Sequence, residues 1–162
     1  SAIEEAIRRI GSIALVHEML SVNAQEMVEF DEVADRLIAA VKDVSTLRSG
    51  ITLERTGKFG ALRPEVATPL ALILTELIQN AYEHGLATTG STLAIVVNRT
   101  GDQLRLEVSD DGIGLPEDFD IQSSESLGLQ IVKTLTTNEL GGKIEVHRVA
   151  NGGTRIEVDI YC

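Results

Sequence analysis

The sequence predicts an α/β fold, a two-layer sandwich in which three helices cover one face of a mixed, largely antiparallel sheet, with a further helix leading at the N-terminus. Two observations predict it. In the first half of the chain, apolar residues recur every three or four positions, which is helical spacing, whereas in the second half they alternate with polar residues, as in half-buried strands. Alternating strands leave one apolar sheet face, and the helices can cover it.

Four segments have the spacing of amphipathic helices. The leading segment carries glutamates and arginines opposite an apolar stripe, so this stripe must face a partner helix or the body of the domain. Asp31 stands where it can cap the second helix, Pro64 suits the first turn of the third, and Gly85 can end it. The expected helices are Ile3–Ser21, Asp31–Leu47, Pro64–His84 and Gly128–Asn138.

Five segments favour strands. One stands alone, and the other four form two pairs, each joined by a glycine-containing turn that is typical of a hairpin. The turns are expected at Arg99–Asp102 and Asn151–Gly153. The expected strands are Ile51–Arg55, Thr92–Val97, Gln103–Val108, Lys143–Val149 and Arg155–Ile160.

Composition excludes several classes of protein. A chain of 162 residues with net charge -11 is one ordinary domain with an appended helix and lacks the basic surface that nucleic acids require. No apolar run approaches the roughly 20 residues of a membrane helix, and the one cysteine, Cys162, fits a reducing compartment. We therefore expect a cytoplasmic location, with no nucleic acid and no membrane contact. The spacing of the three histidines does not predict a zinc site.

The third predicted helix carries a polar stripe. Glu76, Asn80 and His84 are four residues apart and share one face of the helix. A carboxamide oxygen is a ligand that Mg²⁺ accepts, so this face suits a Mg-phosphate site. An ordinary solvated polar face is the alternative for this helix taken alone.

A second polar element follows the third expected strand. Asp110 and Asp111 precede Gly112 and Gly114, whose spacing lets the backbone turn sharply and a flat ring approach closely. A carboxylate there can accept a hydrogen bond from an exocyclic amine such as that of adenine. Asp-Gly is also a common turn, and the spacing of a calcium-binding EF-hand is missing.

The third element is the run Ser126-Leu127-Gly128-Leu129 at the start of the last helix. Free N–H groups and the positive end of a helix dipole would point at phosphates there. Residues 117–125 before it are polar and could form a mobile lid, although a plain surface loop is the alternative. A phosphate-binding P-loop, a protein-kinase glycine loop and a nucleophile elbow are all absent from the sequence.

These elements, in this order, resemble the GHKL or Bergerat ATP-binding fold of histidine kinases, gyrase-type topoisomerases, Hsp90 and MutL proteins. The run Glu76-Leu-Ile-Gln-Asn80 is similar to the asparagine box, Asp110-Asp-Gly-Ile-Gly114 to the first glycine box, and Ser126-Leu-Gly-Leu to the second. Gly152-Gly-Thr154 is similar to the last box. The sequences of the second box and of the leading helix resemble those of histidine kinases with the second type of dimerisation domain.

The resemblance implies a set of roles for the site residues. Asn80 would hold Mg²⁺, Asp110 would bind the adenine amine, and Glu76 would assist or orient the incoming histidine. Thr154 would support Asp110 or the adenine. The remaining ATP-binding positions implied are His84, Gly112, Gly114, Leu127, Gly128 and Leu129. Glu83 stands where many histidine kinases carry Lys or Arg, so less positive charge faces the phosphates, and Ser126 replaces a glycine of longer-lidded relatives.

The same resemblance implies a division of the chain and a set of partners. Residues 1–24 would be the end of a dimerisation and phosphoacceptor helix, and residues 25–162 the catalytic domain. His17 precedes Glu18 as in a common acceptor box, but its apolar neighbours and the missing proline lead us to interpret it as structural. The acceptor would then lie before Ser1. His147 is interpreted as a surface residue.

The implied function is a two-component sensor histidine kinase. The γ-phosphate of ATP would pass to a histidine and then to an aspartate of a response regulator, in a protein that is a homodimer at full length. Alternatives are an anti-sigma-factor serine kinase of the same fold and a non-catalytic nucleotide-binding interaction module. A clamp-type ATPase would need a longer lid and a transducer domain.

Overall fold

A five-stranded sheet organises the computed structural model, which describes residues 2–20, 26–44, 50–86, 89–115, 119–120, 127–150 and 152–162. The strand order is β2-β4-β5-β7-β6, and only β2 and β4 are parallel. A separate two-stranded ladder joins β1 to β3. The strands are β1 Val28–Glu29, β2 Thr52–Thr56, β3 Ala61–Leu62, β4 Thr92–Thr100, β5 Gln103–Asp110, β6 Lys143–Arg148 and β7 Thr154–Tyr161.

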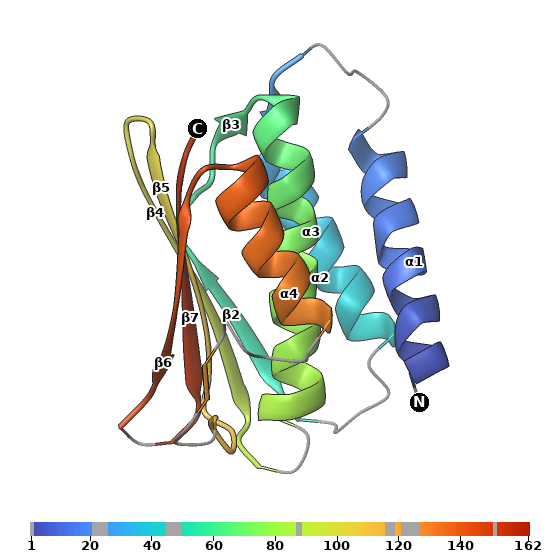
Figure 1. The fold of residues 1–162 in the computed structure, drawn as a ribbon, viewed down its shortest axis with the longest axis vertical. Coiled ribbons are helices and arrows are strands. Elements are labelled where there is room, and N and C mark those ends of the chain that lie inside the picture. Colours follow the sequence, from blue (N-terminus) through green and yellow to red (C-terminus); the bar gives the residue numbers. More distant parts are fainter. Residues whose placement is uncertain are drawn as a thin grey trace.

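Helices cover one face of this sheet (Figure 1). The central helix, α3, contacts the other three, and α1 packs against α3 on the side away from the sheet. The helices are α1 Ala2–Leu20, α2 Phe30–Val44, α3 Pro64–Asn80 and α4 Leu127–Thr134, and α3 and α4 each continue into a π-helical turn, Ala81–Gly85 and Leu135–Glu139. The predicted fold class, three helices on one face of a mixed sheet plus a leading helix, is confirmed.

The core lies between the sheet and α2, α3 and α4. Every second residue of the central strands is buried, as the alternating pattern predicts, and most of α3 is buried because it has helices or sheet on every side. The buried strand residues are Leu93, Ile95, Val97, Leu104, Leu106, Val108, Ile156, Val158 and Ile160. This arrangement fixes the ends of α3, β5 and β7 beside one another.

Two local expectations differ from the structure. The strands of the first hairpin extend to Thr100 and begin again at Gln103, so the turn is only Gly101 and Asp102. Asp31 does not cap α2, which begins at Phe30. Its carboxylate instead accepts the N–H groups of Phe59 and Gly60, at 3.0 and 2.9 Å, and a hydrogen bond from Arg55 at 2.9 Å. The prediction of an N-cap was therefore wrong, because the loop after β2 offers this carboxylate better donors.

We expect Asp31→Asn to lower the free energy of unfolding by about 1–2 kcal/mol at pH 7, because an amide accepts these hydrogen bonds less strongly than a carboxylate does. Burial would raise the pKa of Asp31, but the N–H groups of Gly60 and Phe59 together with Arg55 hold it below its ordinary value. The stability that Asp31 contributes through its lowered pKa is fully present above the pKa of the unfolded chain, 3.8. It is lost as the pH falls through the pKa of the folded chain.

Urea titrations of both proteins from pH 7 downwards measure this effect. The gap between wild type and Asp31→Asn should close only below the ordinary aspartate range. Asp35→Asn is the matched control, because Asp35 is mostly exposed and pairs with the same Arg55. A gap that persists unchanged at the lowest pH at which the chain folds would contradict the assignment.

The leading helix has one face on the domain and one face in solvent. Val16 and Arg9 are buried against the rest of the chain, whereas Ile3, Ile7, Ile10 and Ile13 are between 50% and 72% exposed. His17 is exposed as well, so the expectation that its apolar neighbours cover it is wrong. Among the described residues, no helix combines the length and the apolar character that a membrane crossing requires.

Candidate functional site

A cavity of about 270 Å³ opens between the end of α3, its π-helical turn, the adjoining ends of β5 and β7, and α4. Six of the residues implied as ATP-binding line it together: Asn80, His84, Asp110, Gly114, Leu129 and Thr154. They come from four separate sequence motifs, so the fold brings together residues that are far apart in the sequence. The volume is near the lower end of the range for small-molecule pockets, about 300–1,000 Å³.

Most of the remaining wall is apolar, and sequence reasoning missed it. The additional lining residues are Leu77, Ala81, Val108, Ile113, Leu115, Phe119 and Ile156. Leu77 and Ala81 have the spacing of core residues on α3, and Val108 and Ile156 have the alternation of core residues on strands. Nothing in that spacing distinguishes a side chain against the core from one against a cavity. An apolar wall with a few polar groups suits a flat heterocycle.

Asp110 is the buried acid of this cavity. It is 8% exposed, and its Oδ1 accepts the N–H of Gly112 at 2.9 Å. Burial raises the pKa of Asp110, the Gly112 N–H opposes this, and the charge of Asp111 adds to it. Asp111 itself is a structural residue, since its carboxylate accepts the N–H groups of Ser91 and Thr92 at 2.8 Å each. Asp110, in contrast, lines the cavity with its buried carboxylate.

Two glycines hold the backbone close around Asp110. Gly114 and Gly153 have φ values of 74° and 87°, where side chains are strained. A Cβ on Gly153 would overlap the carbonyl oxygen of Asp110, and a Cβ on Gly114 would lie 3.1 Å from the carbonyl oxygen of Gly153. The turn after β5 and the turn before β7 therefore need glycine in order to pack against each other.

Asn80 and His84 lie where α3 changes its helical period. Asn80 is the last α-helical residue, and His84 lies in the following π-helical turn, a geometry that is frequent at functional sites. Both side chains line the cavity, Asn80 half-buried and His84 exposed. Asn80 and His84 were expected to share one face of the helix, and both line the same cavity in the structure.

Glu76, the third residue of the polar stripe, does not line the cavity. It is buried and pairs with Arg9 of α1, with Glu76 Oε1 3.1 Å from Arg9 Nε. Two neighbouring contacts of α1 are more exposed than this pair. Gln79 Nε2 of α3 donates to Ser12 Oγ at 3.0 Å, and Arg8 pairs at 3.0 Å with Glu83 of the π-helical turn. The polar stripe is therefore shared between the cavity and the leading helix.

Gly128 lies against this buried ion pair. A Cβ there would be 2.7 Å from Arg9 Nη2 and 2.7 Å from Glu76 Oε2, so a larger residue at this position would push the ends of these two side chains away. Gly112 is buried beside Asp110, and Leu127 is 52% exposed. Ser126 lies outside the described residues. Of the expected lid, the structure describes 119–120, and Phe119 lines the cavity.

Two family models match the chain. Residues 65–161 match the model described as histidine kinase-, DNA gyrase B-, and HSP90-like ATPase, which includes every residue of the cavity. Residues 1–45 match a model described as histidine kinase, which includes α1 and α2. The first match covers more than half of the chain.

Curated relatives and solved structures agree with these models. The chain is 42% identical over 96% of its length to the sensor histidine kinase PdtaS of Mycolicibacterium smegmatis, and 41% identical to PdtaS of Mycobacterium tuberculosis. It spans 32% and 31% of those proteins. The histidine kinase domain of the EL346 blue-light activated kinase from Erythrobacter litoralis superposes with a TM-score of 0.81 at 26% identity, over 94% of this chain and 77% of that one.

Proposed function

Since this chain belongs to the family of histidine kinase-, DNA gyrase B- and HSP90-like ATPases, we propose that it is the catalytic part of a two-component sensor kinase that binds Mg-ATP in the cavity beside Asp110. The γ-phosphate passes to a histidine and from there to an aspartate of a response regulator. The 42% identity to a sensor histidine kinase supports this assignment over the serine kinases of the same fold.

The observation that carries the proposal is a single buried carboxylate in an apolar cavity. Asp110 is almost fully covered, and apolar side chains such as Val108, Ile113 and Ile156 surround it. A purine ring fits such walls, and its exocyclic amine can donate to the carboxylate. A non-catalytic interaction surface would have no use for a buried acid at the bottom of a pocket.

The remaining roles follow the positions of the residues around Asp110. Gly112 and Gly114 shape the turn on which the adenine lies, and Thr154 supports Asp110 from β7, where the two residues are register partners. The α4 residues act through their backbone N–H groups at the start of the helix, where phosphates are favoured. These are Leu127, Gly128 and Leu129.

Asn80 and His84 form the polar side of the cavity. Asn80 offers a carboxamide oxygen, which suits Mg²⁺, and His84 faces the same space from the π-helical turn. When bound, Mg²⁺ would neutralise part of the negative charge on the phosphates. The chain itself contributes positioning, as is general in phosphoryl transfer.

Glu76 is the residue that we assign to the incoming histidine. In the described structure Arg9 holds its carboxylate, so the leading helix and the acceptor would compete for the same group. Transfer would then require that α1 and α3 separate at this point. Arg9 thus restrains Glu76 until a phosphoacceptor helix reaches it.

We assign residues 1–24 to the end of a dimerisation and phosphoacceptor helix, and residues 25–162 to the catalytic domain. The exposed isoleucines of α1 recur at positions 3, 7 and 10, the spacing of a helix-packing seam, and no described residue covers them. The occupant that we propose is the other helix of the dimerisation domain, in a homodimer of the full-length cytoplasmic protein. The acceptor histidine lies there, and exposed His17 is not the acceptor.

The test is phosphate transfer from labelled ATP to a separately produced, histidine-bearing dimerisation domain. Wild type should give a labelled product that acid destroys, as phosphohistidine requires, and Asn80→Ala should give none. The same variant should also lose the difference in ATP affinity between buffers with Mg²⁺ and with a chelator. The matched control is Asn98→Ala, since Asn98 is exposed on β4. An acid-stable product would point to a serine kinase instead, and transfer to His17 of the chain itself would overturn the acceptor assignment.

A further inference from the structure

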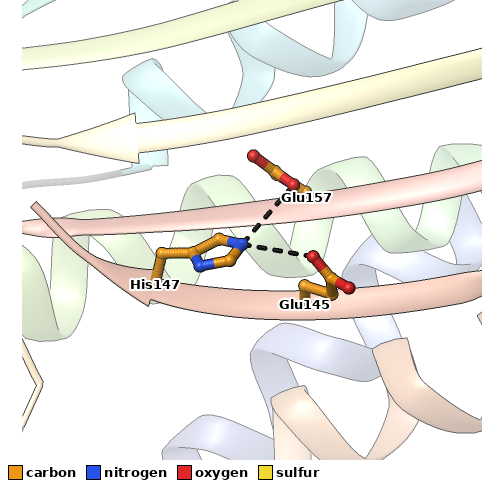
Figure 2. A group of neighbouring side chains, drawn as sticks. All are labelled: Glu145, His147 and Glu157. Carbon is orange, nitrogen blue, oxygen red and sulfur yellow. Dashed lines mark ion pairs between the residues drawn. The ribbon is translucent and has the colours of Figure 1, made fainter.

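Three side chains of the second hairpin converge on the sheet face opposite the helices. None of the three lines the ATP cavity or belongs to the motifs that form it. Glu145 and His147 are two apart on β6 and therefore share a face, and Glu157 on β7 is the register partner of Glu145. Figure 2 shows both carboxylates directed at the same imidazole nitrogen of His147. The donor atoms of the three residues all lie within 4.8 Å of one another.

The imidazole nitrogen at the centre is buried. Nε2 of His147 has no hydrogen-bond partner among the described residues, although the side chain as a whole is 38% exposed. Its distances to Glu145 Oε2 and Glu157 Oε2 are 3.4 and 3.5 Å, longer than the usual N–H···O range of about 2.7–3.2 Å. The prediction of an ordinary surface histidine was therefore incomplete, because the atom that carries its chemistry is covered.

Like charges meet across this part of the sheet. Glu157 stands directly opposite Glu145 on one side and Glu107 on the other, and like charges in register destabilise strand pairing. Two cations offset part of the repulsion: Lys143 is 2.6 Å from Glu145 Oε1, and Arg155 is 3.2 Å from Glu157 Oε1. Both cations contact the Oε1 atoms and leave the two Oε2 atoms for His147.

These contacts resemble the outer support of a metal site. Ligating carboxylates in proteins are themselves hydrogen-bonded, and such partners orient them toward the ion. Tetrahedral zinc has bonds of about 2.0–2.2 Å, which places its ligand atoms about 3.3–3.6 Å apart. The two measured distances from Nε2 fall in that interval.

We propose that Glu145, His147 and Glu157 form a zinc-binding site on the outer face of the β6–β7 hairpin. One imidazole and two carboxylates suit Zn²⁺, whereas Mg²⁺ takes oxygen ligands alone. The site is therefore chemically distinct from the magnesium assigned to Asn80. Three protein ligands leave a fourth tetrahedral position open to water.

Calorimetric titration of the whole chain with zinc chloride tests the proposal. We expect saturable uptake of one zinc ion per chain, with Mg²⁺ in excess unable to compete. His147→Gln and Glu157→Gln should each weaken zinc binding by at least about tenfold, the loss seen even for residues behind the ligands. Lys143→Met should weaken it by a smaller factor. Nitrogen NMR of the imidazoles should move the His147 signals on zinc addition and leave those of His17 unchanged.

The controls separate this site from other zinc-binding positions. His84→Gln removes the histidine of the ATP cavity, His17→Gln removes the exposed one on α1, and Glu54→Gln removes an exposed carboxylate on β2; all three variants should bind zinc like wild type. Circular dichroism checks that each variant is folded. Absence of zinc uptake by wild type, or uptake that survives His147→Gln unchanged, would overturn the proposal.

Discussion

Asp110→Asn is expected to weaken ATP binding by about 10- to 100-fold. A hydrogen bond to a charged acceptor is worth about 1.5–3 kcal/mol, and each 1.4 kcal/mol is a factor of ten in affinity. The amide also turns an N–H₂ group toward a buried space that is built for an acceptor, where the Gly112 N–H already donates. Calorimetry with Mg-ATP measures the loss directly.

The same substitution should not destabilise the ligand-free chain. Burial raises the pKa of Asp110 in the folded chain. The contribution of such a group to stability is present at low pH and is lost as the pH rises through the folded pKa, so the ionised form of Asp110 opposes folding at neutral pH. A neutral amide avoids that cost. Asp102→Asn, in the turn between β4 and β5, is the control for nucleotide binding. Unchanged ATP affinity in Asp110→Asn would remove the adenine-binding role.

The order and type of the long elements could be predicted from the sequence because their periods differ. The alternation from Leu93 to Val108 and the stripe of α3 each reflect one buried face, and the structure has both. The ladder between β1 and β3 could not be predicted, because two residues per strand are too few to show any period. Asp31 has the sequence context of a helix cap, but a loop from elsewhere in the chain takes its carboxylate.

The polar part of the candidate site could be predicted because motifs specify it, and the apolar part could not. Asn80 and Asp110 stand out by residue type, whereas Ile156 looks like any other core residue of a strand. Contacts between segments that are distant in the chain could not be predicted from the sequence either. Glu157 is ten residues beyond His147 on another strand, and Arg9 reaches Glu76 from a helix at the other end of the chain. Neither spacing follows a local pattern.

Arg9→Met is expected to lower the free energy of unfolding by about 3 kcal/mol, because removing one partner of a buried ion pair leaves the other charge without compensation. The side chains of Arg9 and Glu76 are only 10% and 8% exposed. The cost has an upper limit, since α1 can detach from α3 and let Glu76 hydrate. Denaturant titration together with amide hydrogen exchange in α1 distinguishes the two responses: a global loss of stability, or loss of protection in α1 alone.

Arg8→Met is the matched control, because Arg8 is the neighbouring residue and also pairs with a glutamate of the same helical segment. That pair is 42% and 22% exposed, so its loss should cost less than about 1 kcal/mol. The double variant Arg9→Met with Glu76→Gln should regain much of the stability that Arg9→Met loses, because no buried charge is then left behind. Independent, additive effects of the two substitutions would mean that Arg9 does not hold Glu76, and the restraint that we assign to the leading helix would have no physical basis.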